Sequence, residues 1–179
     1  MMTVLVGLVR TIDAINERIG QAVSWLTLGC VLVCFAVVVL RYGFGIGFLW
    51  MQELYVWFHA AVFMLGAGFT YLHGGHVRVD ILFGRLSPRG KAWTDIFGTL
   101  VFLFPWLAVV VYWGIPFFMA SWNINEVSMQ AGGMPYLWLM KAVVLGFCAV
   151  LGIQGVAHLA RSVLVLNGHP EFLPEEGEA

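Results

Sequence analysis

Four long runs of apolar residues alternate with short polar segments along the chain. Each run reaches the roughly 20 residues that an α-helix needs to cross the hydrocarbon core of a bilayer. The runs predict four transmembrane helices, at residues 22–40, 48–71, 96–118 and 136–159. The first run is longer than the roughly 7–15 apolar residues of a signal sequence, and acidic side chains precede it. We therefore expect it to remain in the mature protein.

A helical pattern of apolar and polar positions precedes the first span. One face carries Val4, Leu5, Leu8, Ile12, Ile15 and Ile19, and the other carries Arg10, Asp13, Asn16 and Glu17. This pattern predicts an amphipathic helix at residues 3–19 that lies in the membrane interface. Two alternatives are a solvated extension of the first span and a brace against another subunit.

Capping and breaking residues divide the second half of the chain. Ser87 followed by Pro88 predicts a capped helix start after the connection between spans two and three. Pro105 predicts a kink inside span three. We expect residues 1–166 to form one all-α membrane domain. The acidic tail at 167–179 is expected to be disordered.

The composition agrees with this fold class and excludes several functions. Hydrophobic residues make up 61% of the 179 residues and charged residues 11%, against roughly 25% charged residues in a soluble domain. The net charge of -1 leaves no basic excess for a phosphate backbone. A soluble enzyme and a nucleic-acid-binding protein are therefore both excluded.

The basic residues indicate how the spans are oriented. Of the nine Lys and Arg residues, all except Arg41 and Lys141 lie before span one, between spans two and three, or after span four. Basic residues collect in cytoplasmic segments near span ends. Both termini are therefore predicted to lie in the cytoplasm.

Histidine and cysteine leave one alternative function open. Cys30, Cys34 and Cys148 lie within spans and form no ligand set for zinc. Small four-helix cytochromes hold haem between histidines on facing helices. A shallow haem would need His73 or His76 together with His158. The alternative is therefore a b-type cytochrome that anchors an oxidoreductase in the membrane.

Glu53 is the acidic residue that needs the most explanation. It lies one turn inside the predicted outer end of span two, near Trp50. A charge at the centre of a span costs roughly 2.5–3.5 kcal/mol on insertion scales, but at this depth the side chain can reach the interface and stay ionised. Arg41 is the nearest countercharge in the sequence. We predict an ion pair between Arg41 and Glu53, and the alternative is a contact of Glu53 with a partner protein.

Small residues in spans two and four allow close helix approach. They are Gly66, Gly68, Gly146, Ala149, Gly152 and Gly155. Small residues let helix backbones come close together in a membrane. The approaching helix belongs either to this chain or to another subunit.

An ordered set of motifs resembles a known family of membrane proteins. The motifs are Arg41-Tyr-Gly-Phe, Trp50-Met-Gln-Glu53-Leu, Phe63-Met-Leu-Gly66-Ala, His76-Val-Arg78-Val-Asp80-Ile-Leu, Glu126-Val-Ser128, Ala131-Gly-Gly-Met-Pro135 and the stretch from Lys141 to Gly146. Together they resemble the small membrane subunit (the DctQ-like, Q-type small permease) of tripartite ATP-independent periplasmic (TRAP) transporters. Many relatives have a proline shortly before the glycine that matches Gly146, whereas Val144 and Leu145 stand here.

The resemblance implies an accessory role without catalysis or a cofactor. In this family a large membrane subunit carries the solute and sodium sites, and a periplasmic protein delivers the substrate, a small organic acid or related solute. The large subunit would be a separate chain in a bacterial or archaeal cytoplasmic (inner) membrane. The outer connections, Arg41 to Glu53 and Ala120 to Met134, would lie where the delivery protein docks. The candidate structural or subunit-contact residues are Arg41, Trp50, Glu53, Gly66, His76, Arg78, Asp80, Glu126 and Lys141.

Overall fold

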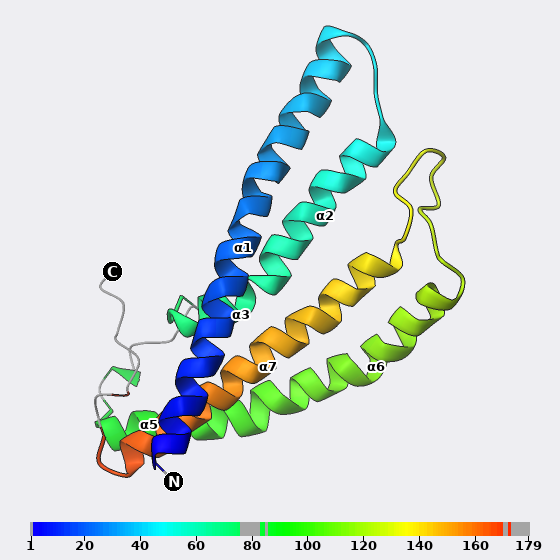
Figure 1. Cartoon of the computed structure of the whole chain (residues 1–179). Coiled ribbons are helices and arrows are strands. Elements are labelled where there is room, and N and C mark those ends of the chain that lie inside the picture. The colour runs from blue at the N-terminus through cyan, green and yellow to red at the C-terminus, as the bar shows by residue number, and fades with distance from the viewer. Residues whose placement is uncertain (1, 76–82, 85, 170–171, 173–179) are drawn as a thin grey trace. The chain divides into compact units, whose positions relative to one another are not determined.

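The fold is built from helices that are long enough to cross a bilayer (Figure 1). The computed structural model describes residues 2–75, 83–84, 86–169 and 172. Within these residues the regular structure is helical and no strand is present. Four helical segments are long and apolar enough to span a membrane: Met2–Gly43, Leu49–Leu72, Pro88–Asn123 and Trp138–Leu166. The prediction of four transmembrane helices is therefore confirmed.

The first helix, α1 (Met2–Gly43), runs without interruption for 42 residues. Residues 3–19 are therefore the first part of a long helix and do not form a separate one. In a helix that lies in the membrane interface, polar side chains would face water. Here Asn16 is instead fully buried, whereas Val4 is 74% exposed. Polar side chains of a helix in an apolar solvent face the helix bundle.

The second span consists of α2 (Leu49–Leu65) and α3 (Ala67–Leu72), which Gly66 separates. A Cβ atom at Gly66 would lie 2.6 Å from the carbonyl oxygen of Val62. Real Cβ contacts essentially never come so close. A side chain at Gly66 would therefore clash with the preceding turn of α2.

The third span begins where the sequence predicts, and its helix is irregular just before Pro105. Ser87 Oγ accepts a hydrogen bond from the Gly90 amide at 3.2 Å, which confirms the capped start of α5 (Pro88–Gly98). A π-helical turn, η1 (Thr99–Leu103), then leads into α6 (Phe104–Asn123). A proline lacks an amide hydrogen and its ring crowds the preceding turn. The π-helical turn ends two residues before Pro105, and single π turns of this kind occur inside α-helices.

The fourth span is one helix, α7 (Trp138–Leu166), in the described chain. Val144 and Leu145, which stand where the family resemblance leads to an expected proline, lie inside this helix. Both residues can donate the backbone hydrogen bond that proline lacks.

The helices contribute to two compact units. Unit 1 contains the described residues of Met1–Arg18, Ala67–Val110 and Cys148–Ala179. Its buried apolar residues include Val9, Ala92, Leu107, Ala157 and Leu164. Unit 2 contains Ile19–Gly66 and Val111–Phe147.

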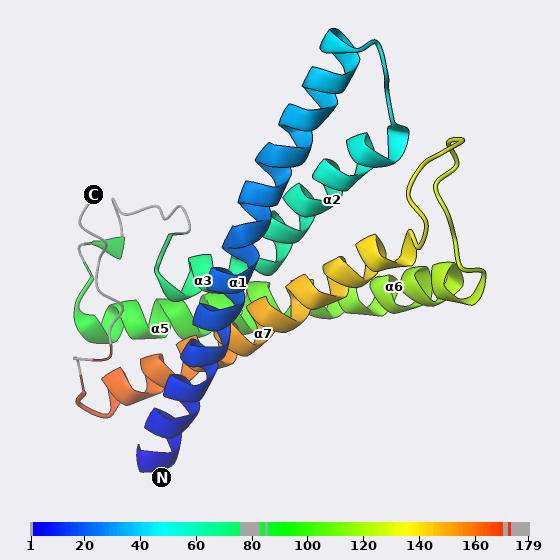
Figure 2. The ribbon, with the colours of Figure 1, turned by 45° about the horizontal axis from the view of Figure 1, so that its top comes forward.

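Close helix contacts hold unit 2 together. α1 and α2 lie side by side in both ribbon views (Figure 2), and a Cβ atom at Gly29 would lie 3.0 Å from the ring of Phe58. A Cβ atom at Gly146 of α7 would lie 2.8 Å from Leu65 Cδ2 of α2. The small residues therefore serve packing inside this chain at these positions.

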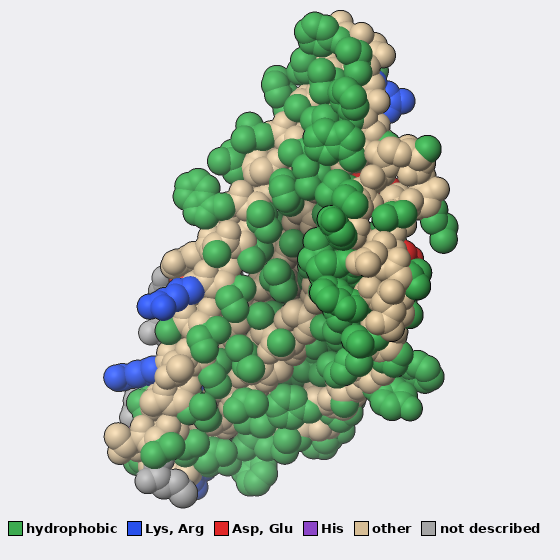
Figure 3. Space-filling model, turned by 45° about the vertical axis from the view of Figure 1, so that its right-hand side comes forward, with side chains coloured by type: hydrophobic (Ala, Val, Ile, Leu, Met, Phe, Trp, Pro, Cys, Tyr) green, Lys and Arg blue, Asp and Glu red, His purple; other side chains and the backbone are tan. Residues whose placement is uncertain are grey.

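Large apolar side chains cover much of the helical surface (Figure 3). Trp25 is 72% exposed, Phe35 66%, Phe102 66% and Trp113 69%. Such extensive apolar exposure marks membrane or protein contact surfaces and not a surface in water. The exposed side chains thus agree with helices that lie in a bilayer.

Candidate functional site

A group of polar residues in unit 2 joins helix α2 to the connection between α6 and α7. We call Glu53, Glu126, Ser128, Met134 and Lys141 the loop cluster. Glu53 comes from the first half of α2, Lys141 comes from the start of α7, and the other three residues belong to the connection 124–137. Three of the candidate residues from the sequence, Glu53, Glu126 and Lys141, are therefore brought to one place.

Both carboxylate oxygens of Glu53 accept hydrogen bonds from the connection. Ser128 Oγ donates to Oε1 at 2.5 Å, and the Met134 amide donates to Oε2 at 2.5 Å. Hydrogen bonds to an ionised acceptor are short and stronger than those between neutral groups. Glu53 is thus held by two donors that lie 75 and 81 residues further along the chain.

The ion pair predicted between Arg41 and Glu53 is not formed among the residues that the structure describes, so this prediction is wrong. The Arg41 side chain is exposed, and no ion pair joins it to Glu53 in the described chain. Two hydrogen bonds satisfy the carboxylate without a countercharge, which is why the nearest arginine is not needed. Trp50, one turn before Glu53, lies beside Phe48 with the ring centres 6.3 Å apart.

Lys141 and Glu126 form the charged part of the loop cluster. Lys141 Nζ lies 2.5 Å from Glu126 Oε2, and the ammonium group also lies over the Phe117 ring at 4.0 Å from its centre. A cation in the first turn of a helix is disfavoured by the helix dipole. Glu126 and the aromatic ring offset this cost, since each attracts a cation.

The hydrogen bond from Lys141 lowers the pKa of the Glu126 carboxyl below its ordinary value of 4.5. A lowered pKa in the folded state means that the ion pair adds stability above the ordinary value and loses it as the pH falls through the folded-state pKa. We expect thermal unfolding of the wild type and Glu126→Gln to differ by a constant amount between about pH 6 and pH 8, and the difference to shrink below about pH 4.5. A difference that stays the same under strongly acidic conditions would contradict the assignment.

Backbone hydrogen bonds shape the connection 124–137. The Leu137 amide donates to the Glu126 carbonyl at 2.8 Å, and the Ser128 amide donates to the Met134 carbonyl at 3.1 Å. Gly132 takes a left-handed conformation with φ +80°, which favours glycine. The connection is therefore a closed hairpin-like loop.

The outer side of this loop is apolar. Met129 is 99% exposed, Ile124 is 72% exposed and Val127 is 58% exposed. Large apolar side chains on a loop that is fixed by polar contacts are typical of a contact surface. The loop cluster can thus present these side chains in a defined position.

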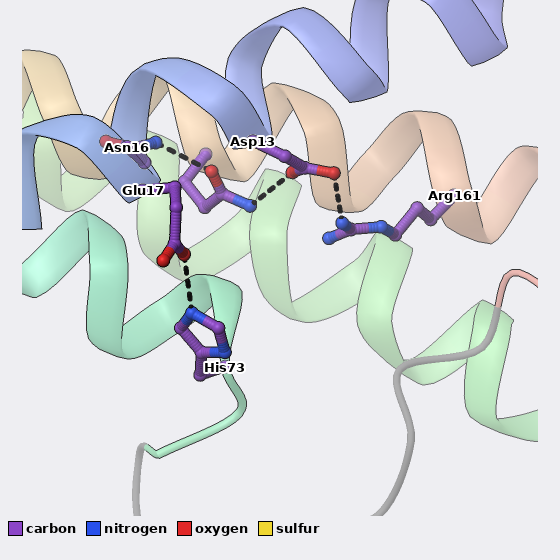
Figure 4. Close-up of polar contacts among 6 residues, drawn as sticks. Asp13, Asn16, Glu17, His73 and Arg161 are labelled. Carbon is purple, nitrogen blue, oxygen red and sulfur yellow. Dashed lines mark hydrogen bonds and ion pairs between the residues drawn. The ribbon is translucent and has the colours of Figure 1, made fainter.

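A second polar group lies in unit 1 and joins α1 to α7 (Figure 4). We call Asp13, Asn16, Gln154 and Arg161 the helix-anchor cluster. Arg161 Nη2 lies 2.5 Å from Asp13 Oδ2, and Gln154 Nε2 donates to Asp13 Oδ1 at 3.1 Å. Asn16 Nδ2 donates to Gln154 Oε1 at 2.6 Å and also faces the Val150 carbonyl at 3.3 Å. One continuous chain of hydrogen bonds therefore connects the two helices.

Two histidines of unit 1 are directed at carboxylates. His73 Nε2 lies 2.8 Å from Glu17 Oε2, and His158 Nε2 lies 3.5 Å from Asp95 Oδ2. The His158 ring also lies against Tyr71, with 5.1 Å between ring centres. A haem held by His73 and His158 through these nitrogens would have to displace both contacts. A stoichiometric Soret band in the visible spectrum of the purified chain would show that haem is bound.

The remaining candidate residues have different outcomes. Gly66 ends α2 and does not line either polar cluster. His76, Arg78 and Asp80 lie outside the described residues. Among the described residues, no three His, Cys, Asp or Glu side chains come together as a group that could hold a metal ion.

The sequence did not indicate that Asn16, Gln154 and Ser128 take part in the polar clusters. Gln154 carries a usable signal, because an amide inside an apolar span requires a hydrogen-bond partner. Asn16 lies three residues after Asp13, so that the two share one helix face. Ser128 has no such signal, since a serine in a polar connection is ordinary.

The sequence of the chain was compared with models of known protein families. Residues 30–165 match the family model described as tripartite ATP-independent periplasmic transporters, DctQ component. The chain belongs to the DctQ family. As a DctQ component it is a multi-pass membrane protein and the small permease subunit of a TRAP transporter. The loop cluster lies wholly within the matched residues, whereas Asp13 and Asn16 of the helix-anchor cluster precede them. No curated protein and no solved structure matches the chain significantly.

Proposed function

We propose that this DctQ component is the accessory scaffold subunit of a sodium-coupled TRAP transporter that imports a small organic acid or a related solute. It stabilises a separate large permease subunit, which holds the solute and sodium sites, and helps a periplasmic binding protein to dock. The family match over residues 30–165 carries this proposal. The chain itself needs neither a catalytic group nor a cofactor for such a role.

Polar side chains that bond to other parts of the same chain support a scaffold role. Asp13 is engaged by Arg161, Glu126 by Lys141, and Glu53 by the connection 124–137. Polar groups that bond one helix or loop to another in this way stabilise a rigid frame.

The charge distribution supports an orientation with both termini in the cytoplasm. Most Lys and Arg residues fall in the segments that this orientation places there. The connections 44–48 and 124–137 then face the periplasm. Both belong to unit 2, and the second is the one with apolar side chains on a fixed loop.

Assembly tests the proposed partner. We expect the tagged chain, expressed together with a large TRAP membrane subunit from the same organism, to copurify with that subunit at a fixed ratio in detergent. Expression of the tagged chain with an unrelated multi-span permease serves as the control. Purification of the chain free of the large subunit under conditions in which both are folded would contradict the scaffold role.

A further inference from the structure

We propose that Glu53 is a positioning residue that fixes the tip of the connection 124–137 for contact with the periplasmic binding protein. The tip is the part from Ser128 to Met134. The inference rests on the proposed docking role of this connection. Glu53 itself is not a docking residue in this scheme. It acts through Ser128 and Met134, which it holds together.

The carboxylate of Glu53 bridges the two sides of the loop, one at Ser128 and the other at Met134. Its Oε1 takes the Ser128 hydroxyl and its Oε2 takes the Met134 amide, each at 2.5 Å. Ser128 and Met134 also bond each other directly, through the Ser128 amide and the Met134 carbonyl at 3.1 Å. The three hydrogen bonds close a ring that joins both sides of the loop to helix α2.

Gly133 shows how closely the loop approaches Glu53. A Cβ atom at this position would lie 2.5 Å from Ser128 Oγ and 2.9 Å from Glu53 Oε1. The Ser128 atoms have no room to withdraw while the hydroxyl keeps its bond to Glu53. Gly133→Ala therefore offers a second way to disrupt the same ring without changing a charged residue.

The ring of hydrogen bonds fixes the position of Ser128, and next to it lies Met129, the most exposed apolar side chain of the loop. The base of the loop is held independently, by the bond between Leu137 and Glu126 and by the ion pair of Glu126 with Lys141. Met129 follows Ser128 directly, and Val127 precedes it. Loss of Glu53 is thus expected to free the tip while the base stays in place.

A soluble protein is the partner that this surface fits. The charged groups at the base are already paired with each other, so the tip offers apolar contacts without a net charge of its own. Exposed apolar side chains on a preorganised loop gain affinity because little ordering is required on binding. Burial of the tip in lipid is the alternative that the test must separate.

A spin label reports the position of the tip without any assumption about docking. Met129→Cys would be labelled after Cys30, Cys34 and Cys148 have been replaced by alanine, in the complex with the large subunit in nanodiscs. We expect Glu53→Ala and Gly133→Ala to make the label clearly more mobile. Glu53→Gln should stay near the wild type, since its amide can still accept from Met134 and bond Ser128. Gly98→Ala, where an added Cβ meets nothing within 4 Å, is the control.

Transport then reports docking, in chains that keep Met129. The rate of transport would be measured at increasing concentrations of the binding protein. We expect Glu53→Ala to raise the half-saturating concentration of the binding protein about tenfold at an unchanged maximal rate, because a poorly ordered tip must be ordered on binding. For Glu53→Gln, the half-saturating concentration should stay close to that of the wild type. A purely structural defect would instead lower the maximal rate of every variant that is less stable.

The outcomes separate the two claims. An immobile label in both Glu53→Ala and Gly133→Ala would overturn the positioning role. A mobile label with an unchanged half-saturating concentration would overturn the docking role of the connection and leave Glu53 as a brace only. Strong relaxation of the wild-type label by oxygen, with weak relaxation by a water-soluble nickel complex, would place the tip in lipid and also overturn docking.

Discussion

Arg161→Ala is expected to lower the free energy of unfolding by about 2 kcal/mol. Arg161 and Asp13 are mostly withdrawn from solvent, with side-chain exposures of 17% and 22%. Removal of the arginine leaves the Asp13 carboxylate with Gln154 as its remaining partner in the helix-anchor cluster. The cost is below that of a fully buried pair because water still reaches both groups.

A double-mutant cycle measures this interaction directly. Unfolding in mixed micelles would be followed for Arg161→Ala, Asp13→Ala and the double variant, with the exposed Arg10→Ala as the control. The double variant should lose clearly less than the sum of the two single variants, since each single change removes the same contact. Additive losses would show that Asp13 and Arg161 do not stabilise each other.

Gly68→Ala is expected to destabilise the same region by about 1–3 kcal/mol. A Cβ atom at Gly68 would collide with Asn16 Oδ1 and would lie 3.0 Å from the carbonyl oxygen of Val150. Asn16 cannot easily move away, because it is fully buried and its amide nitrogen is bound to Gln154. The added methyl group must therefore displace backbone or break the hydrogen-bond chain.

Gly7→Ala provides the matched control for this prediction. Gly7 is also helical and belongs to unit 1, but an added Cβ there meets nothing within 4 Å. The substitution should be neutral or slightly stabilising, because alanine is the better helix former. Equal effects of the two substitutions on unfolding would argue against the close contact at Gly68.

Local patterns in the sequence predicted the helices well. Apolar runs of sufficient length gave the four spans, and the Ser87–Pro88 pair gave the start of α5. Pro105 marked the irregular part of the third span, although the form it takes, a π turn at Thr99–Leu103, was not foreseen. These features depend on neighbouring residues, so that the sequence contains the information directly.

The partners of the polar residues were harder to predict. Periodicity correctly put Asp13, Asn16 and Glu17 on one face, but it could not tell whether this face meets water or another helix. The face meets α7 and the turn after α3 through residues far away in the sequence. Periodicity describes one helix alone, whereas burial depends on what packs against it.

Glu53 illustrates the same limit in the candidate site. The sequence identified it as a residue that needs a partner and offered Arg41 because that charge is close along the chain. The actual partners are a hydroxyl and a backbone amide on a distant loop. A carboxylate is satisfied equally well by donors without charge, and these leave little trace in a single sequence.

Reconstitution tests the central claim, that this chain is a scaffold and not a transporter in its own right. Liposomes would hold the small subunit alone, the large subunit alone, or both, with a sodium gradient and the loaded binding protein outside. We expect uptake driven by sodium only when both subunits are present, and none with the small subunit alone. Sodium-driven uptake of substrate by liposomes that contain only the small subunit would contradict the account.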